Sequence, residues 1–325
     1  MIIVSAPSKI HLLGEHVVVY GRPALLAAID KRLYVKIKNQ KSKVPGLAKH
    51  GAGKNQKKVT IYTKEKDDLI WETIEVFKKS FSIDKLPPLE ITITSQIPTG
   101  CGLGSSAALS AALIGALMKS VKNLWNPGKI NELTYTVEKI AHGNPSGADN
   151  TTVVFGGLVW YRREFEFLKS IWSLPISLYK FPKFGIIDSG RPQEGTREMV
   201  SFVTHQYKKN NQKMDEIFYD QENQTKNLLL SLKNNDNQLL ITSLKKGEEN
   251  LEKIGVVGKI SQKIIREIES LGGAAKVCGA GGRKKASGVI LCYHSDLSII
   301  NNVMKKYNLS VSPIKLGEEG IRIEQ

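Results

Sequence analysis

The sequence predicts an α+β fold that is divided into two domains. The chain has 325 residues, which exceeds the usual size of a single domain. Apolar residues alternate with a period of two in some stretches and recur every three or four residues in others, so strands and helices are mixed along the chain. Hydrophobic residues make up 41% of the sequence, enough for sizeable cores. We place the N-terminal domain at residues 1–165 and the C-terminal domain at residues 166–325.

The N-terminal segment combines a short strand with isolated charged residues. Residues 2–5 are apolar and predict a strand, and residues 6–21 follow with Lys9, Glu15 and His16 among apolar neighbours. A buried lysine is unfavourable unless it is paired. Lys9 therefore requires an anionic partner, and a structural ion pair and a functional site both meet that requirement.

A basic segment follows and holds most of the excess positive charge. Residues 31–64 contain 11 Lys or Arg and no acidic residue, in a chain of formal net charge +16. Residues 33–37 alternate like an edge strand, residues 59–62 predict another strand, and residues 39–58 lack an apolar period and predict an exposed loop. Nucleic-acid binding is one reading of such a patch. Because residues 36–60 lack aromatic side chains and any recognition motif, we favour a solvated loop or weak steering of an anionic ligand.

The central feature is a glycine-rich turn between a strand and a helix. Residues 89–94 alternate like a half-buried strand, and residues 107–118 are rich in Ala and Leu like a buried helix. The glycines of residues 98–108 let the backbone approach a ligand, and the helix N-terminus favours negative charge. Ser105 and Ser106 are placed to cap the helix or to reach a metal ion. The turn predicts a phosphate cradle, although a tight turn with a serine cap fits equally; it is not a P-loop, because no Gly-Lys-Ser/Thr closes it.

Two acidic residues, Glu138 and Asp149, lie on a predicted helix and on the loop that follows it. Asn126-Pro127 looks like the start of a helix that ends near Gly143. Glu138 lies at the edge of its apolar stripe, where a glutamate is usually solvated. Residues 142–150 form a loop rich in glycine and proline that carries Asp149 into an apolar segment, residues 151–154, which we interpret as a strand. An acidic residue after a constrained loop is well placed for a catalytic role. An aspartate that caps the turn accounts for the same pattern.

The remaining segments complete the mixed pattern and indicate a compartment. We expect helices at residues 67–81, 194–271 and 295–307, and strands at residues 183–188, 289–292 and 320–324. No apolar run approaches the ~18 residues of a membrane span, and the first 16 residues lack the pattern of a signal peptide. The three cysteines are widely spaced and form neither a disulfide framework nor a zinc site. We therefore expect a cytoplasmic protein with no membrane and no nucleic-acid partner.

Three motifs in the same order carry a family resemblance. The first is Ala-Pro-x-Lys followed by Gly-Glu-His-x-Val-Val-Tyr-Gly, within residues 6–21. The second is Pro-x-x-x-Gly-Leu-Gly-Ser-Ser-Ala-Ala, at residues 98–108, and the third is Glu-x-x-x-His-Gly-x-Pro-Ser-Gly-x-Asp-Asn, at residues 138–150. Residues 279–282 match the start of a late glycine-rich motif. With these, the sequence resembles the GHMP small-molecule kinases, and among them the mevalonate kinases.

The resemblance implies a fold and a reaction. The fold is an N-terminal βαβ-type domain and a ferredoxin-like C-terminal domain with the site between them. The reaction is ATP-dependent, Mg²⁺-requiring phosphorylation of mevalonate to 5-phosphomevalonate. The sequence does not fix the oligomeric state and leaves a homodimer open. The residues implied to bind ATP are Gly100, Gly102, Leu103, Gly104, Ser105, Ser106 and Ala107.

The resemblance also assigns roles to the polar residues. Asp149 accepts or orients the proton of the substrate hydroxyl, with Lys9 as its partner. Ser106 and Glu138 are the implied magnesium ligands. His16 and Thr196 are the implied mevalonate contacts, Glu15 lies beside them, and Lys9 and Asp149 also face the substrate.

Two departures and two rival functions remain open at this stage. Ser8 replaces a usual glycine, and residues 283–285, Arg-Lys-Lys, replace smaller residues, so their basic groups either point outward or add charge near the phosphates. One rival is a sibling kinase that acts on phosphomevalonate or a sugar. The other is a non-catalytic ligand sensor on the same fold. A sensor need not retain Lys9 and Asp149 together with both magnesium ligands, so we favour the kinase.

Overall fold

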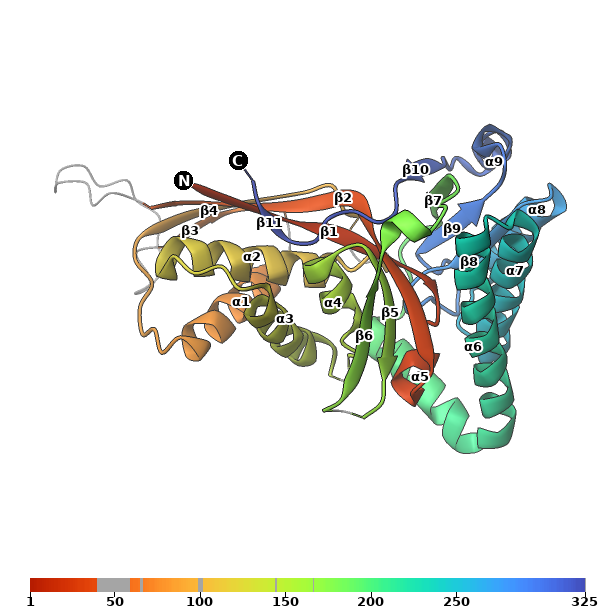
Figure 1. Cartoon of the computed structure of the whole chain (residues 1–325), viewed down its shortest axis with the longest axis horizontal. Helices are drawn as coiled ribbons and strands as arrows, with labels where there is room; N and C mark the ends of the chain where they lie inside the picture. The colour runs from red at the N-terminus through yellow and green to blue at the C-terminus, as the bar shows by residue number, and fades with distance from the viewer. Residues whose placement is uncertain (40–58, 65–66, 99–101, 144, 166, 325) are drawn as a thin grey trace.

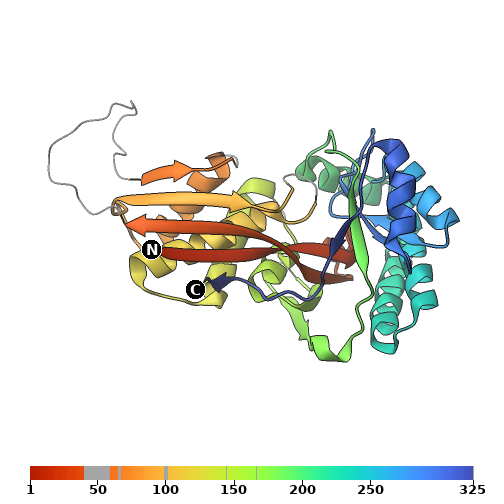
Figure 2. The ribbon, with the colours of Figure 1, turned by 90° about the horizontal axis from the view of Figure 1, so that it is seen from above.

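A computed structural model describes residues 1–39, 59–64, 67–98, 102–143, 145–165 and 167–324. Within these residues the chain forms a seven-stranded sheet and a four-stranded sheet, with helices packed against both. Figures 1 and 2 show the two sheets at opposite ends of the molecule. The mixed architecture confirms the predicted α+β class. The predicted loop at residues 39–58 and the predicted ligand contact Gly100 lie, apart from Asn39, outside the described residues.

The larger sheet contains the N-terminal strands and both chain ends. Its strands are β1 (Ile2–Leu13), β2 (Pro23–Asn39), β3 (Val59–Tyr62), β4 (Leu89–Ser95), β5 (Leu158–Arg163), β6 (Lys169–Leu174) and β11 (Arg322–Ile323). The order is β11-β1-β2-β4-β3, and β5 joins β2 and β6. The covering helices are α1 (Asp67–Ser80), α2 (Ser105–Lys122), α3 (Pro127–His142) and α4 (Ala148–Phe155), which lie together on one face of this sheet (Figure 1).

The smaller sheet belongs to the second half of the chain. Its strands, in the antiparallel order β10-β7-β9-β8, are β7 (Phe184–Asp188), β8 (Ala274–Val277), β9 (Val289–Tyr293) and β10 (Ser312–Ile314). Its helices are α5 (Thr196–Lys209), α6 (Asn211–Asn234), α7 (Asn237–Ile254), α8 (Lys259–Ser270) and α9 (Leu297–Met304). This arrangement confirms the predicted ferredoxin-like half. The boundary after residue 165 stays a prediction, and β6 and β11 lie beyond it in the larger sheet.

The alternation at residues 33–37 marks a central strand, so the predicted edge position is wrong. Residues 33–37 of β2 pair with β1 on one side and with β4 on the other. Leu33, Val35 and Ile37 are buried, whereas Tyr34 and Lys36 are partly exposed. Alternation therefore reports a sheet with one covered face, and it does not report whether a strand has a neighbour.

The segment at residues 151–154 is helical, which corrects the predicted strand. It forms the middle of α4, where Thr151 and Thr152 donate their hydroxyl hydrogens to the carbonyl oxygens four residues earlier. All four side chains of the segment are buried against neighbouring elements. Packing on all sides overrides the β preference of Thr and Val, because that preference depends on context. As a result Asp149 lies in the first turn of a helix.

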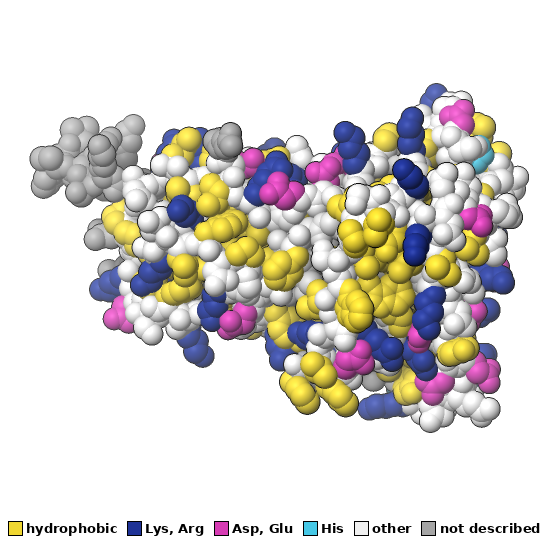
Figure 3. Space-filling view, in the orientation of Figure 1, with side chains coloured by type: hydrophobic (Ala, Val, Ile, Leu, Met, Phe, Trp, Pro, Cys, Tyr) yellow, Lys and Arg dark blue, Asp and Glu magenta, His cyan; other side chains and the backbone are white. Residues whose placement is uncertain are grey.

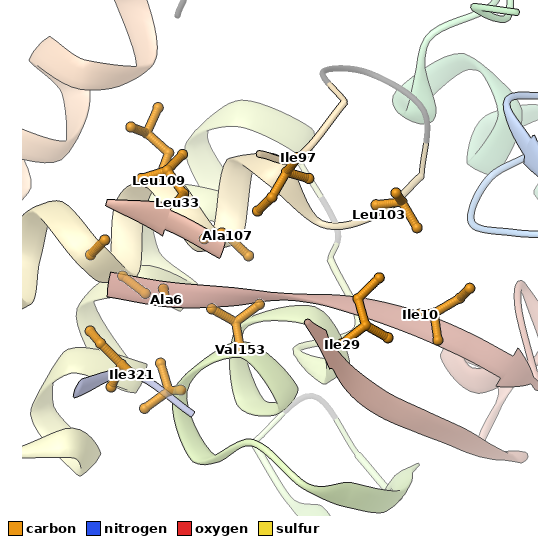
Figure 4. Packing of buried hydrophobic residues seen from close by; sticks show 14 of the residues in the cluster. Ala6, Ile10, Ile29, Leu33, Ile97, Leu103, Ala107, Leu109, Val153 and Ile321 are labelled. Carbon is orange, nitrogen blue, oxygen red and sulfur yellow. The ribbon is translucent and has the colours of Figure 1, made fainter. Parts of the chain in front are cut away.

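The main core lies between the larger sheet and its helices. Figure 4 shows Ile10 and Ile29 of β1 and β2 with Ala107 of α2 and Val153 of α4 in one buried cluster. The cluster fixes α2 and α4 on the sheet, so the N-termini of both helices are held beside β1. No helix among the described residues is long and apolar enough to cross a membrane.

Candidate active site

A cavity of about 530 Å³ opens beside the C-terminal half of β1. Its wall comes from β1, from α1, from the N-terminal parts of α2, α4 and α5, from the end of α3, and from the turn after β8. The predicted site residues that line it are Lys9, Glu15, His16, Gly102, Gly104, Ser105, Ser106, Glu138, Asp149 and Thr196. The predicted contacts Leu103 and Ala107 do not line the cavity; their side chains are buried in the main core instead.

Lys9 and Asp149 form an ion pair at the centre of the wall. The Lys9 Nζ lies 3.0 Å from Asp149 Oδ2, and the lysine side chain is 2% exposed whereas the aspartate is 33% exposed. This contact confirms that Lys9 has an anionic partner. The carboxylate also lies in the first turn of α4, where the helix dipole favours negative charge. The pair therefore presents an anionic oxygen to the cavity and keeps its counter-ion buried.

The glycine-rich turn is packed tightly against β1 and the turn after β8. Gly102 and Gly104 adopt left-handed φ angles of 86° and 74°. A Cβ on Gly102 would lie 2.6 Å from the Cys278 carbonyl oxygen, and one on Gly104 would lie 2.9 Å from the Lys9 side chain. Only glycine fits both the conformation and the space. The first N–H groups of α2 have no partner within the helix, so they suit an anion.

Glu138 is buried at the inner end of the cavity, contrary to the usual exposure of a helix-surface glutamate. It is 4% exposed, and burial, together with the nearby Asp149 charge, raises its pKa to about 7 while a hydrogen bond from Ser106 opposes that shift. Its Oε1 has no hydrogen-bond partner among the described residues. The Ser106 Oγ also lies 3.3 Å from His142 Nε2. A hard cation would suit this unsatisfied carboxylate oxygen and the adjacent hydroxyl.

The polar residues beneath the cavity include a pair that sequence reasoning missed. Lys276 of β8 is fully buried and pairs with Glu15, and its Nζ also donates to the His11 carbonyl oxygen at 3.3 Å. Burial raises the pKa of Glu15 against the pull of Lys276. Burial disfavours the Lys276 charge, but nearby groups including Glu15 outweigh it and raise its pKa. The lysine inside the apolar segment that forms β8 is the sequence signal that could have indicated this buried pair.

His16 and Thr196 also line the cavity. His16 has a left-handed φ of 61°, and its Nε2 lies 3.1 Å from the Ala280 carbonyl oxygen. Burial lowers the pKa of His16 to about 4, so the ring is neutral near pH 7. Thr196 begins α5 and lines the cavity together with Arg191, a cation that the sequence reasoning did not single out.

The basic stretch at residues 283–285 points outward. All three side chains are exposed, and none of them lines the cavity. The Arg283 guanidinium lies over the Phe202 ring, 3.8 Å from its centroid. The alternative in which these groups add charge near bound phosphates is therefore not the arrangement in the structure.

Comparisons with known proteins agree on one family. Residues 68–157 match the GHMP kinases N terminal domain. The chain is 32% identical over 311 residues to the mevalonate kinase of Pyrococcus furiosus, covering 87% of this chain and 85% of that protein. It is 30% identical over 328 residues to the mevalonate kinase of Archaeoglobus fulgidus, covering 99% and 100%. It shares its fold with the crystal structure of the Methanococcus jannaschii mevalonate kinase, at a TM-score of 0.79 and 22% identity, covering 97% and 98%.

Proposed function

Since the chain belongs to the mevalonate kinase family of the GHMP kinases, we propose that it transfers a phosphoryl group from ATP to mevalonate. The product is 5-phosphomevalonate, an intermediate of isoprenoid biosynthesis. The observation that supports this most strongly is the Lys9–Asp149 pair, 3.0 Å apart, beside the N-terminus of α2 in one cavity. A partly exposed carboxylate next to a phosphate cradle is what transfer to a hydroxyl requires.

Asp149 accepts or orients the hydroxyl proton, and Lys9 neutralises the carboxylate. The Asp149 carboxylate is positioned by two independent constraints: its place in the first turn of α4 and its ion pair with Lys9 of β1. The turn before α2 binds the phosphates through backbone N–H groups, so the cradle supplies charge stabilisation without a side-chain cation. Phosphoryl transfer depends mainly on such positioning and charge neutralisation.

Ser106 and Glu138 are the residues that would hold Mg²⁺. The fit rests on the unsatisfied Glu138 Oε1 and on the hydrogen bond between the two side chains. Magnesium takes one or two protein carboxylates and completes its shell with phosphates and water. When bound, Mg²⁺ would neutralise phosphate charge.

His16, Thr196 and Arg191 line the cavity, and we assign them to the substrate. Because the Nε2–H of the neutral His16 ring donates to the Ala280 carbonyl oxygen, its Nδ1 is left to accept a hydrogen bond from a substrate hydroxyl. Arg191 attracts a carboxylate such as that of mevalonate. Glu15 lines the same region, but one of its oxygens is engaged by Lys276. Its other oxygen is buried and has no partner among the described residues, so we propose that Glu15 acts on the substrate end through its charge and through Lys276, and not by direct contact.

The test is an ADP-release assay with mevalonate, phosphomevalonate, galactose and homoserine side by side. We expect turnover with mevalonate, and a preference for phosphomevalonate or galactose would identify a sibling kinase. Asp149→Asn should lower kcat by ~10²–10⁴, whereas Asp236→Asn, a helix-capping aspartate on α7, should not. No turnover with any substrate would contradict the kinase and favour a sensor.

We also propose that two copies of the chain associate through β6 and the segment around it. Figure 3 shows apolar side chains gathered over the region of β5 and β6. The exposed ones are Phe165, Phe167, Leu168, Ile171, Trp172, Ile176 and Leu178. Exposed apolar side chains gathered in this way favour an interaction surface.

Light scattering after size-exclusion chromatography tests this association. Trp172→Glu should convert a dimer into a monomer, and the matched change Leu230→Glu, at an exposed leucine on α6, should not. A monomeric wild-type protein would contradict the proposal.

A further inference from the structure

His11 is a cavity residue to which the proposed mechanism gives no role. It lies on β1 two positions after Lys9, and alternate residues of a strand share a face. Its side chain is 8% exposed, and it lines the cavity. The imidazole therefore stands beside the Lys9–Asp149 pair and is shielded from bulk water.

The Lys9 ammonium has three acceptors, and His11 is one of them. The Lys9 Nζ lies 3.0 Å from Asp149 Oδ2, 3.1 Å from His11 Nδ1 and 3.2 Å from the Gly102 carbonyl oxygen. An ammonium group has three N–H donors, so each is matched by one acceptor. The orientation of the Lys9 ammonium group is then fixed by three acceptors, which come from β1, α4 and the glycine-rich turn.

The imidazole is in the form that this contact requires. Burial, followed by the charges of Lys9 and Lys276, lowers the pKa of His11 well below its usual value. A neutral ring with an accepting Nδ1 carries its proton on Nε2, an assignment that follows from the contact with Lys9. His11 Nε2 lies 4.0 Å from Asp149 Oδ1, which is too long for a hydrogen bond. The N–H nevertheless faces the second oxygen of the same carboxylate.

We propose that His11 is a positioning residue that holds the Lys9 ammonium against Asp149 and so fixes the carboxylate toward the substrate hydroxyl. This inference rests on the proposed phosphoryl transfer. His11 acts through Lys9, and no contact between His11 and the reacting atoms is required.

A purely structural role makes a different prediction. If His11 only fills space on β1, leucine should replace it with little effect on turnover. If it positions Lys9, leucine leaves one N–H of a buried ammonium without an acceptor, which is unfavourable. The ammonium then turns toward another acceptor, and a displacement of about 1 Å in a catalytic group costs up to ~10²-fold in rate.

The experiment compares kcat and KM for the full-length wild type, His11→Leu, His11→Asn and His11→Gln. We expect His11→Leu to lower kcat by roughly 10–100-fold while KM for ATP and for mevalonate changes by less than about threefold. His11→Asn should recover most of the loss, because its Oδ1 can occupy the place of the Nδ1 acceptor. His11→Gln, whose amide lies farther along the side chain, should recover less.

A double-mutant cycle separates positioning from packing. In an Asp149→Asn background, His11→Leu should cost less than about threefold in the residual rate, because the partner that it orients is gone. Full additivity, an effect on KM alone, or equal loss in His11→Asn and His11→Leu would overturn the proposal. If His11→Leu fails to fold, as judged by circular dichroism, the comparison of His11→Asn with His11→Gln decides. A wild type inactive on all four substrates contradicts the proposed function, whereas an active wild type matched by His11→Leu contradicts only this inference.

Discussion

Replacing Lys276 by methionine should destabilise the protein strongly. The Lys276 side chain is fully buried, pairs with Glu15, and donates to the carbonyl oxygens of Val277 and His11 at 2.6 and 3.3 Å. Methionine fills a similar volume but has no donor. The change therefore leaves the Glu15 carboxylate and two backbone oxygens buried and without their cation.

The magnitude follows from the burial of both partners. Removing one member of a buried ion pair costs about 3–5 kcal/mol, because the other charge stays in a site that water does not reach. For a chain of this size about 1 kcal/mol shifts Tm by roughly 2 °C. We therefore expect Lys276→Met to lower Tm by about 6–10 °C. The double variant Lys276→Met/Glu15→Gln should recover part of the loss, since no buried charge remains.

Differential scanning calorimetry at pH 7 measures the effect, with Lys246→Met as the control. Lys246 lies on α7 and is exposed, so its replacement should leave Tm within about 2 °C of the wild type. If Lys276→Met also unfolds within that range, the pair does not stabilise the fold and the reasoning from burial is refuted. If the double variant is less stable than Lys276→Met, the buried carboxylate was not the source of the cost.

Three further predictions concern other buried groups. Tyr161 donates its hydroxyl hydrogen to the Ser146 carbonyl oxygen at 2.5 Å, in the loop that leads to Asp149. Tyr161→Phe should lower the free energy of unfolding by about 1 kcal/mol, measured by urea unfolding, and kcat several-fold, measured by ADP release; an unchanged kcat would exclude support of the loop. Burial raises the pKa of Glu248 to about 8, so the folded protein retains a proton that the unfolded chain loses above about pH 4.5. From pH 5 to 8 the free energy of unfolding of the wild type should therefore fall by about 1.4 kcal/mol per pH unit relative to that of Glu248→Gln. A difference that stays constant with pH in urea unfolding experiments would contradict this. Ser106→Ala and Glu138→Ala should each raise the Mg²⁺ concentration needed for half-maximal activity, and unchanged titration curves for both would exclude them as ligands.

The sequence predicted the fold class from local signals, whereas most of the residues on the cavity wall were predicted from the family resemblance. The apolar period locates α1 and α3, and Asn126 caps α3 by accepting a hydrogen bond from the Lys129 N–H, as its position before a proline indicates. The requirement that Lys9 be paired follows from its apolar neighbours alone. Its contact with Asp149 could be expected only because both residues belong to family motifs.

What the sequence did not predict depends on packing between distant segments. The Thr-Thr-Val-Val run at residues 151–154 has the composition of a strand, and it is helical because it is enclosed by α2, α3 and the larger sheet. Glu138 looks like a surface residue on a helical wheel, and it is buried because the N-termini of α2 and α4 cover that face. Neither effect can be read from the local sequence pattern.

The two buried lysines show how the cavity is tied to the fold. Lys9 lies on β1 of the larger sheet and pairs with a carboxylate on α4, whereas Lys276 lies on β8 of the smaller sheet and pairs with Glu15, just beyond the end of β1. Because each charge is too costly to bury alone, the second pair fixes the smaller sheet to the end of β1. His11 lies between them, with its backbone oxygen bound by Lys276 and its ring bound by Lys9. A change in how the two sheets meet would therefore displace the strand that carries Lys9.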